Sequence, residues 1–115
     1  MTAMTVNDIC TRLEAKLVCG NTDREWNGVY VGDLLSRAMS HVEADNLWIT
    51  IMPNTNTIAV ASLTEAAAVI LAEDVELPNE AIEAANTNGI TVLTSPLSAY
   101  ELCVRLHGIN SGNAV

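Results

Sequence analysis

Apolar residues at helical spacing stand near the start of the chain. They recur at i, i+3, i+4 and i+7, which places them on one face of a helix over about residues 6–14. The four residues are Val6, Ile9, Cys10 and Leu13. Thr5 precedes them as an N-cap, and Asp8 follows three residues later in the position of a capping-box acid. The pattern therefore predicts an amphipathic amino-terminal helix.

Two short β-rich segments come next, at residues 15–19 and 29–31. A turn that begins at Gly20 joins them, because glycine readily adopts a positive φ. After the second segment, apolar residues return to helical spacing over residues 34–39, and Asp33 stands before them as the predicted N-cap. The first 40 residues are therefore expected to alternate between helix and strand.

From residue 47, continuous apolar runs alternate with crossovers of a dozen or more residues. The runs have the length and composition of buried strands, and they are residues 47–52, 67–71 and 90–94. Connections of this length join parallel strands. We therefore expect the α/β class, with a mostly parallel sheet flanked by helices. A single domain would span residues 1–109, followed by a flexible tail at residues 110–115.

The helices predicted in this second part of the chain each carry a candidate cap. Asn56 is the predicted cap of a helix within residues 53–66, and Asn79 of a helix that ends at Gly89. Ser95, followed by a proline, is the predicted cap of the last helix, which runs to about His107.

Charge and composition narrow the classes of function. The net charge is −9, and residues 41–115 carry one basic against nine acidic side chains, so nucleic acid would be repelled. The longest apolar run, residues 66–72, is too short to cross a membrane, and the amino end lacks the features of a secretory signal. Three cysteines without CxxC spacing indicate reduced thiols. We expect a cytoplasmic protein without cofactor or metal.

Several segments carry a resemblance to a known family. The stretch Asp23-Arg24-Glu25-Trp26-Asn27-Gly28 matches in part the signature of the DRTGG domain family, with the Asp, the Arg and one Gly in place. Four further segments closely resemble stand-alone members of that family: residues 30–36, 47–51, 58–63 and 97–101. The chain therefore resembles the DRTGG domain family over nearly its whole length.

The resemblance implies a compact α/β domain similar to the amino-terminal domain of HPr kinase/phosphorylase, and domains of that kind tend to form homodimers. In larger proteins they look like regulatory insertions, for example beside CBS modules in some pyrophosphatases. Kinase activity would need a P-loop, but the sequence has no GxxxxGK[ST] motif, and its only lysine is Lys16. The resemblance thus points to a regulatory domain and not to an enzyme.

Two groups of residues are candidate sites. The first lies in loops at the predicted carboxyl ends of the strands, where parallel sheets bind ligands, and comprises Asn54, Asn56, Thr94, Ser95 and Ser98. These residues could bind a small anionic ligand such as a nucleotide, or simply cap their own helices, and capping is the favoured interpretation. The second group is the signature loop with its neighbours, proposed as an interface: Asp23, Arg24, Trp26, Gly28, Tyr30 and Asp33. Trp26 could instead close the edge of the core.

Three further features invite a chemical interpretation, but each has a simpler one. Cys103 and His107 stand four residues apart and could share a metal if a second pair of ligands, such as Cys10 or His41, completed the site. The favoured alternative is structural: Cys103 belongs to the buried stripe of the last helix, and His107 lies at the margin of that stripe. Glu73, Asp74 and Glu76 could hold a hard cation, but a solvated strand exit accounts for them. Cys19, next to a glycine, is predicted to be the most accessible thiol.

Together these observations favour a non-catalytic regulatory or protein-interaction domain that forms a homodimer and reports to a cytoplasmic protein partner. A mean hydropathy of +0.26 supports dimerisation, because so small a domain cannot readily hide all of its aliphatic surface. The alternative is a sensor of a small ligand, bound by the loops at the strand ends.

Overall fold

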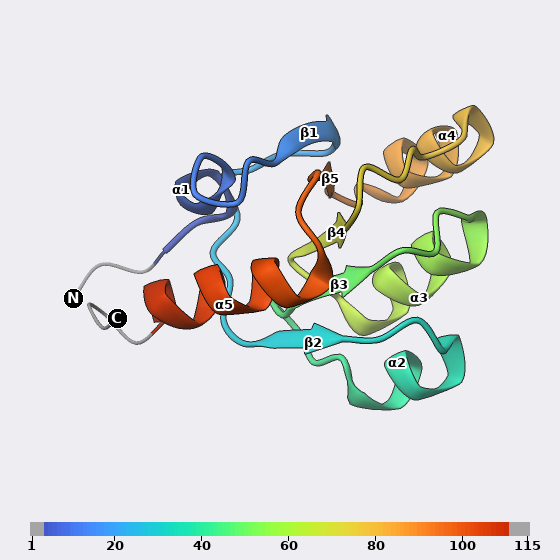
Figure 1. Ribbon diagram of the computed structural model, residues 1–115. Coiled ribbons are helices and arrows are strands. Elements are labelled where there is room, and N and C mark those ends of the chain that lie inside the picture. Colours follow the sequence, from blue (N-terminus) through green and yellow to red (C-terminus); the bar gives the residue numbers. More distant parts are fainter. Residues whose placement is uncertain (1–3, 111–115) are drawn as a thin grey trace.

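The computed structural model describes residues 4–110, with the backbone alone at Asn110, and the predicted tail lies almost wholly outside this range. Five strands form one sheet in the order β1-β5-β4-β3-β2 (Figure 1). The strands are β1 (Lys16–Cys19), β2 (Val29–Val31), β3 (Leu47–Thr50), β4 (Ala68–Leu71) and β5 (Val92–Thr94). The four strands from β2 to β5 pair in parallel, and β1 pairs antiparallel to β5. The predicted α/β class and mostly parallel sheet are confirmed.

Helices cover both faces of this sheet. They are α1 (Val6–Cys10), α2 (Leu35–His41), α3 (Thr55–Thr64), α4 (Asn79–Asn88) and α5 (Ala99–Asn110). Figure 1 shows α5 lying across one face in front of the strands, with α1 beside its carboxyl-terminal half. The other three helices follow β2, β3 and β4 in turn, as crossovers of parallel strands do.

The core consists of two clusters because the central strands are buried on both sides. Every residue of β3 and β4 is buried, in agreement with their continuous apolar composition. Alternate residues point to opposite faces, so Trp48 and Val69 pack toward α2, α3 and α4, while Ile49 and Ile70 pack toward α1 and α5. The sheet is therefore the middle layer of three.

The first helix is shorter than predicted. It ends at Cys10, and residues 11–14 form turns that finish with Glu14 at a φ of 52°. The backbone N–H of Ala15 then donates to the carbonyl of Cys10, which directs the chain into β1. Leu13 stays fully buried without helical geometry, so the apolar spacing was a correct guide to burial and a poor one to the end of the helix.

Several predicted helix caps are wrong, by one to three residues. Asn54, and not Asn56, caps α3, since its side chain accepts a hydrogen bond from the N–H of Thr57. Pro78 takes the place predicted for Asn79 at the start of α4. The prediction for Gly89 is confirmed, because it ends α4 at a φ of 68°.

The other two cap corrections concern Asp33 and Ser95. The Asp33 carboxylate accepts hydrogen bonds from the Thr50 hydroxyl and the Ile51 N–H instead of capping α2, which begins after Leu34. The last helix starts three residues later than predicted, and Ser98 and Glu101 exchange hydrogen bonds at its start as in a capping box.

Candidate functional site

The signature loop lies at the amino ends of the parallel strands, where its polar groups bind neighbouring loops. The Arg24 guanidinium donates to Asp45 Oδ1 at 2.8 Å and to the carbonyl of Glu65 at 2.7 Å. Next to Gly28, which has a φ of 73°, the Asn46 side chain donates to the carbonyl of Asn27 at 2.8 Å. The loop is therefore fastened to the segments that lead into β3 and β4.

A second set of hydrogen bonds fixes the turn at Gly20. The Thr91 hydroxyl accepts from the N–H of Asn21 at 3.0 Å and donates to its carbonyl at 2.8 Å. Gly20 has a φ of 91°, and a Cβ there would lie 2.4 Å from Thr91 Cα. A polar hollow of about 390 Å³ lies over this turn, lined by Gly20, Asn21, Asp23, Arg24, Gly89 and Thr91.

The aromatic residues of the predicted interface point into the molecule. Trp26 is only 7% exposed and packs in the cluster beneath α1 and α5, which agrees with the alternative that it closes the edge of the core. Its indole Nε1 has no hydrogen-bond partner among the described residues. Tyr30 is half-buried on the opposite face, where its ring stacks on His41 at 6.1 Å between centroids. Of the predicted interface group, neither ring supplies an open surface.

The predicted ligand loops both lie at the other end of the sheet, after β3 and after β5, and most of their polar side chains have partners within the chain. Asn54 caps α3, and the Thr94 hydroxyl donates to the carbonyl of Val75. The Ser95 hydroxyl is buried, where it donates to the carbonyl of Leu13 at 2.6 Å and accepts from the N–H of Leu97. These bonds are what helix and turn capping requires, while ligand binding by these residues stays a prediction.

The acidic segment after β4 forms a tight turn. Glu73 and Asp74 both have a φ of 61°, and their N–H groups donate to the carbonyls of Leu97 and Ser95. Within residues 4–110, no group of three or more His, Cys, Asp or Glu side chains is placed to hold a metal ion. The turn thus joins the exits of β4 and β5, which is the simpler interpretation of these residues.

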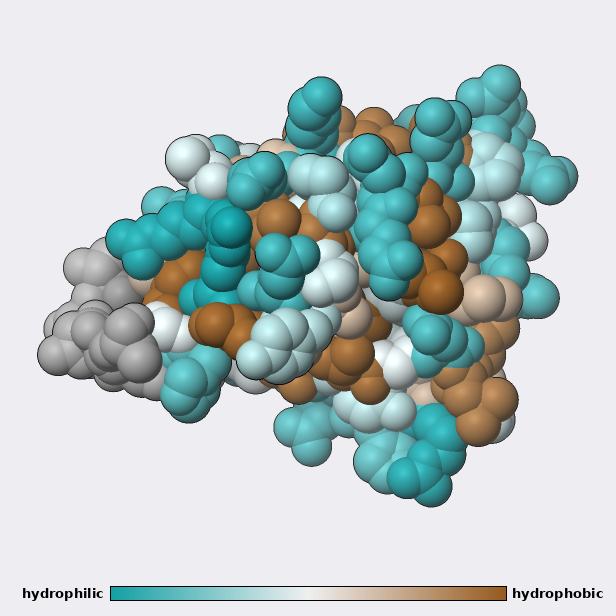
Figure 2. Space-filling view, viewed as in Figure 1, coloured by the Kyte–Doolittle hydropathy of each residue, from teal (hydrophilic) through white to brown (hydrophobic). Residues whose placement is uncertain are grey.

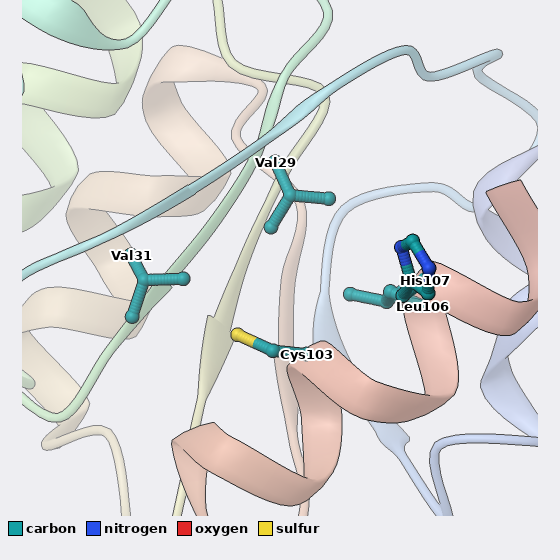
Figure 3. Close-up of a pocket in the computed structure, with 5 residues that line it drawn as sticks. All are labelled: Val29, Val31, Cys103, Leu106 and His107. Atoms are coloured by element: carbon teal, nitrogen blue, oxygen red, sulfur yellow. The ribbon is translucent and has the colours of Figure 1, made fainter.

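An apolar surface that the sequence analysis missed lies between β2 and α5. We call it the β2–α5 face and define it by four residues that are 36 to 77% exposed: Val29, Val31, Tyr100 and Val104. Figure 2 shows brown side chains gathered over β2 beside α5. A hollow of about 310 Å³ lies between the two elements, with Cys103, Leu106 and His107 on the helix side (Figure 3). The hollow opens beside β2, the strand at one edge of the sheet.

The position of each residue around α5 explains this face. At 100° per residue, Leu102 and Leu106 point to the sheet, and the next positions around the helix are Cys103, His107, Tyr100 and Val104 in that order. A second hollow of about 270 Å³ is lined by these last four residues. Arg105 lies on the opposite flank, where it donates to Glu14 and to the carbonyl of Arg12. The flank toward β2 therefore carries no acidic side chain and no arginine.

The three cysteines are all at least partly buried. Burial raises the pKa of Cys10, Cys19 and Cys103 above the ordinary value for a thiol. Cys19 is only 7% exposed, since its side chain faces α4 across the sheet, so the prediction that it is the most accessible thiol is wrong. Cys103 is half-buried and borders both hollows on α5.

One signal for the missed face was present in the sequence. Tyr100 and Val104 stand outside the buried stripe of the last helix, four residues apart, and are too apolar for a solvated flank. The valines of β2 gave no such warning, because only the order of strands in the sheet reveals that β2 is an edge.

These features define a small α/β domain with a mostly parallel sheet and with loops held by hydrogen bonds at both ends of the strands. Residues 8–109 match the DRTGG domain family, and the chain belongs to that family. The resemblance noted from the sequence is thereby confirmed. No curated protein sequence matches the chain. Among residues 4–110, no helix is long and apolar enough to cross a membrane.

Solved structures similar to this chain include one of a regulatory region. It is the crystal structure of the CBS and DRTGG domains of the regulatory region of Clostridium perfringens pyrophosphatase, complexed with its activator, diadenosine tetraphosphate. The TM-score is 0.72 at 18% sequence identity, so the likeness is one of fold. It covers 89% of this chain and 45% of that one, and this chain thus spans less than half the length of the pyrophosphatase regulatory region.

Proposed function

We propose that this chain is a non-catalytic regulatory domain that acts as a homodimer, with the β2–α5 face as the contact between two copies. The observation that carries the proposal is the exposure of Val29 and Val31 on an edge strand, next to Tyr100 and Val104 on α5. Membership of the DRTGG family and the regulatory region in which a similar domain occurs support the regulatory role.

An unpaired strand edge favours a second copy as the occupant. The edge of β2 presents backbone donors and acceptors that another strand can pair with. Two β2 strands related by a two-fold axis perpendicular to the sheet would pair antiparallel and extend it across the dimer. Because such an axis keeps both α5 helices on one face, the flanks that carry Cys103 and His107, with Tyr100 beside them, would face each other.

Electrostatics favour this face over the rest of the surface. Each copy carries a net charge of −9, so two copies repel each other over most of their surface. The β2–α5 face combines exposed apolar side chains with a helix flank free of acidic residues, and the charged Arg105 and Glu101 lie on the far flank. Repulsion between copies is therefore weakest where apolar burial is largest.

The size of the face predicts modest affinity. Full burial of an apolar side chain contributes roughly 1.5–3 kcal/mol, and these four are already partly buried, so each would add about 1 kcal/mol. A stable interface needs about 1,000 Å² in total, which three residues of β2 cannot supply without α5. We expect dissociation in the micromolar range.

Light scattering coupled to size exclusion, over micromolar concentrations, tests the proposal with a matched pair of variants. Val31→Lys places a charge on the edge of β2 and should make the chain monomeric. Leu63→Lys, at a side chain that is 67% exposed on α3, should leave the dimer intact. A wild-type chain that is strictly monomeric at these concentrations, or a dimer that Val31→Lys does not weaken, would contradict the proposal.

A small-ligand sensor is the second candidate, supported by the polar hollow over the signature loop. That hollow of about 390 Å³ is large enough for a small ligand, and the similar pyrophosphatase regulatory region is complexed with a nucleotide activator. Arg24 is its only basic residue, and it already binds Asp45. A rise in melting temperature with adenosine nucleotides, abolished in Asn21→Leu, would support this role, and no shift with any nucleotide at millimolar concentration would contradict it.

A further inference from the structure

Cys103 and His107 form a pair of metal-binding side chains on the flank of α5 that borders β2. They stand at i and i+4, so their Cβ atoms are about 6 Å apart on one side of the helix. In Figure 3 the Cys103 sulfur points toward β2, and His107 lies one turn further along the helix. Both residues line the hollow next to β2 and the adjoining one over Tyr100 and Val104. Thiolate sulfur and imidazole nitrogen are typical zinc ligands.

The pair is incomplete within one chain. A structural zinc site has four ligands in tetrahedral geometry, and no third His, Cys, Asp or Glu joins this pair within residues 4–110. The two residues that the sequence analysis considered as partners lie on other helices, Cys10 on α1 and His41 on α2, where the ring of His41 stacks on Tyr30. Any further ligands must therefore come from outside the described chain.

We propose that the homodimer binds one zinc ion between its two α5 helices, with Cys103 and His107 of each copy as the four ligands. The site rests on the proposed homodimer, because a two-fold axis beside β2 brings the same flank of each α5 face to face. Two sulfurs and two nitrogens then surround a point on the axis, which is a tetrahedral donor set suited to zinc.

The charge and chemistry of the dimer fit a divalent cation. Two copies bring a combined excess of negative charge, which a cation at the interface reduces. Each Cys103 thiol would lose its proton to solvent as its sulfur binds the metal, so two protons are released for each ion. Zinc bound only by the dimer also stabilises the dimer, since binding to one state shifts the equilibrium toward it.

Cobalt(II) is the probe for this site, because it takes tetrahedral zinc sites and reports them by absorption. Metal-free full-length chain is titrated with Co²⁺ in reducing buffer while light scattering follows its mass. The expected result is a sulfur-to-cobalt absorption band that saturates at one ion for two chains, together with at least a tenfold lower dimer dissociation constant. Cys103→Ser should lose the band and His107→Gln should change it, while Cys10→Ser, at a half-buried cysteine on α1, should keep both effects.

The outcomes separate this inference from the proposed homodimer. A dimer that forms without metal and shows no cobalt band would overturn the zinc site and leave the homodimer standing. Saturation at one ion for each monomeric chain would also overturn the zinc site between two copies. A chain that stays monomeric with and without Co²⁺ would overturn both. Circular dichroism of each variant confirms that a lost band does not reflect unfolding.

Discussion

The signature loop and the β2–α5 face differ in how their side chains are used. At the loop, Arg24 and Asn46 bind carbonyl and carboxylate oxygens of the same chain, and Trp26 is buried. At the face, Val31 and Tyr100 are 44% and 77% exposed, with no packing partner above them in the described structure. Residues of the family signature are therefore used for contacts within the chain, while the proposed contact between copies lies elsewhere.

The physical reason lies in the position of each region in the sheet. The loop crosses the amino ends of β2, β3 and β4. Its polar groups form hydrogen bonds that hold it against the segments leading into these strands. The face lies at a lateral edge of the sheet, where no strand among residues 4–110 pairs with the outer side of β2. Substitutions that affect one region alone test this difference.

Gly20→Ala should have the largest effect on stability. The new Cβ would lie 2.4 Å from Thr91 Cα, a backbone atom that cannot easily move, and alanine would also adopt an unfavourable φ of 91°. We expect a loss of about 3 kcal/mol in the free energy of unfolding, from strain and overpacking together. Urea unfolding followed by tryptophan fluorescence measures it.

Gly89→Ala is the matched control for that substitution. Gly89 also has a positive φ, 68°, but a Cβ there meets nothing within 4 Å. It should lose only about 1 kcal/mol, the cost of the left-handed conformation. Equal losses in the two variants would show that the contact with Thr91 is unimportant and that the turn is not held as described.

Much of the fold could be predicted from hydrophobic patterning. The strands were found because runs such as residues 67–71 are continuously apolar, which a strand buried on both faces requires. Caps were less certain, since Asn54 and Asn56 are the same residue type two positions apart and only the backbone decides which one accepts a hydrogen bond. Asp33 was misassigned because its partner, the end of β3, is distant in sequence.

The site was harder to predict than the fold. Trp26 was an interface candidate because it belongs to the signature loop, but packing against α1 and α5 buries it. Val29 and Val31 looked like any strand residues, and only the strand order places them at an edge. The burial of Trp26 and the edge position of β2 both depend on contacts between distant segments. Local sequence patterns could not predict such contacts.

Arg24→Ala separates the two regions at moderate cost. The Arg24–Asp45 ion pair is 41% and 47% exposed, so its loss together with the bond to Glu65 should lower stability by about 1 kcal/mol or less. The dimer dissociation constant should stay unchanged, because the loop is not part of the β2–α5 face. A weaker dimer, measured by analytical ultracentrifugation, would restore the signature loop as the interface.

The smallest expected effect is a pH dependence at α1, which lies outside both regions. The Thr5 N–H and then the Thr5 hydroxyl donate to the Asp8 carboxylate, and these bonds lower the pKa of Asp8. Because the pKa is lower in the folded chain, the capping box stabilises the fold above about pH 4, where the unfolded carboxyl is ionised, and this contribution is lost as the pH falls through the folded value.

Urea midpoints of the wild type and Asp8→Asn, compared from neutral to strongly acid solution, test this dependence. The wild type should be slightly more stable at neutral pH, and the difference should shrink once Asp8 is protonated. Thr5→Ala removes the hydroxyl but keeps the backbone N–H, which is the larger cause of the pKa shift, so it should retain most of the pH dependence. Dimer affinity should be equal in all three, since Asp8 is remote from the β2–α5 face, and a difference that persists unchanged in acid would rule out the carboxylate as its source.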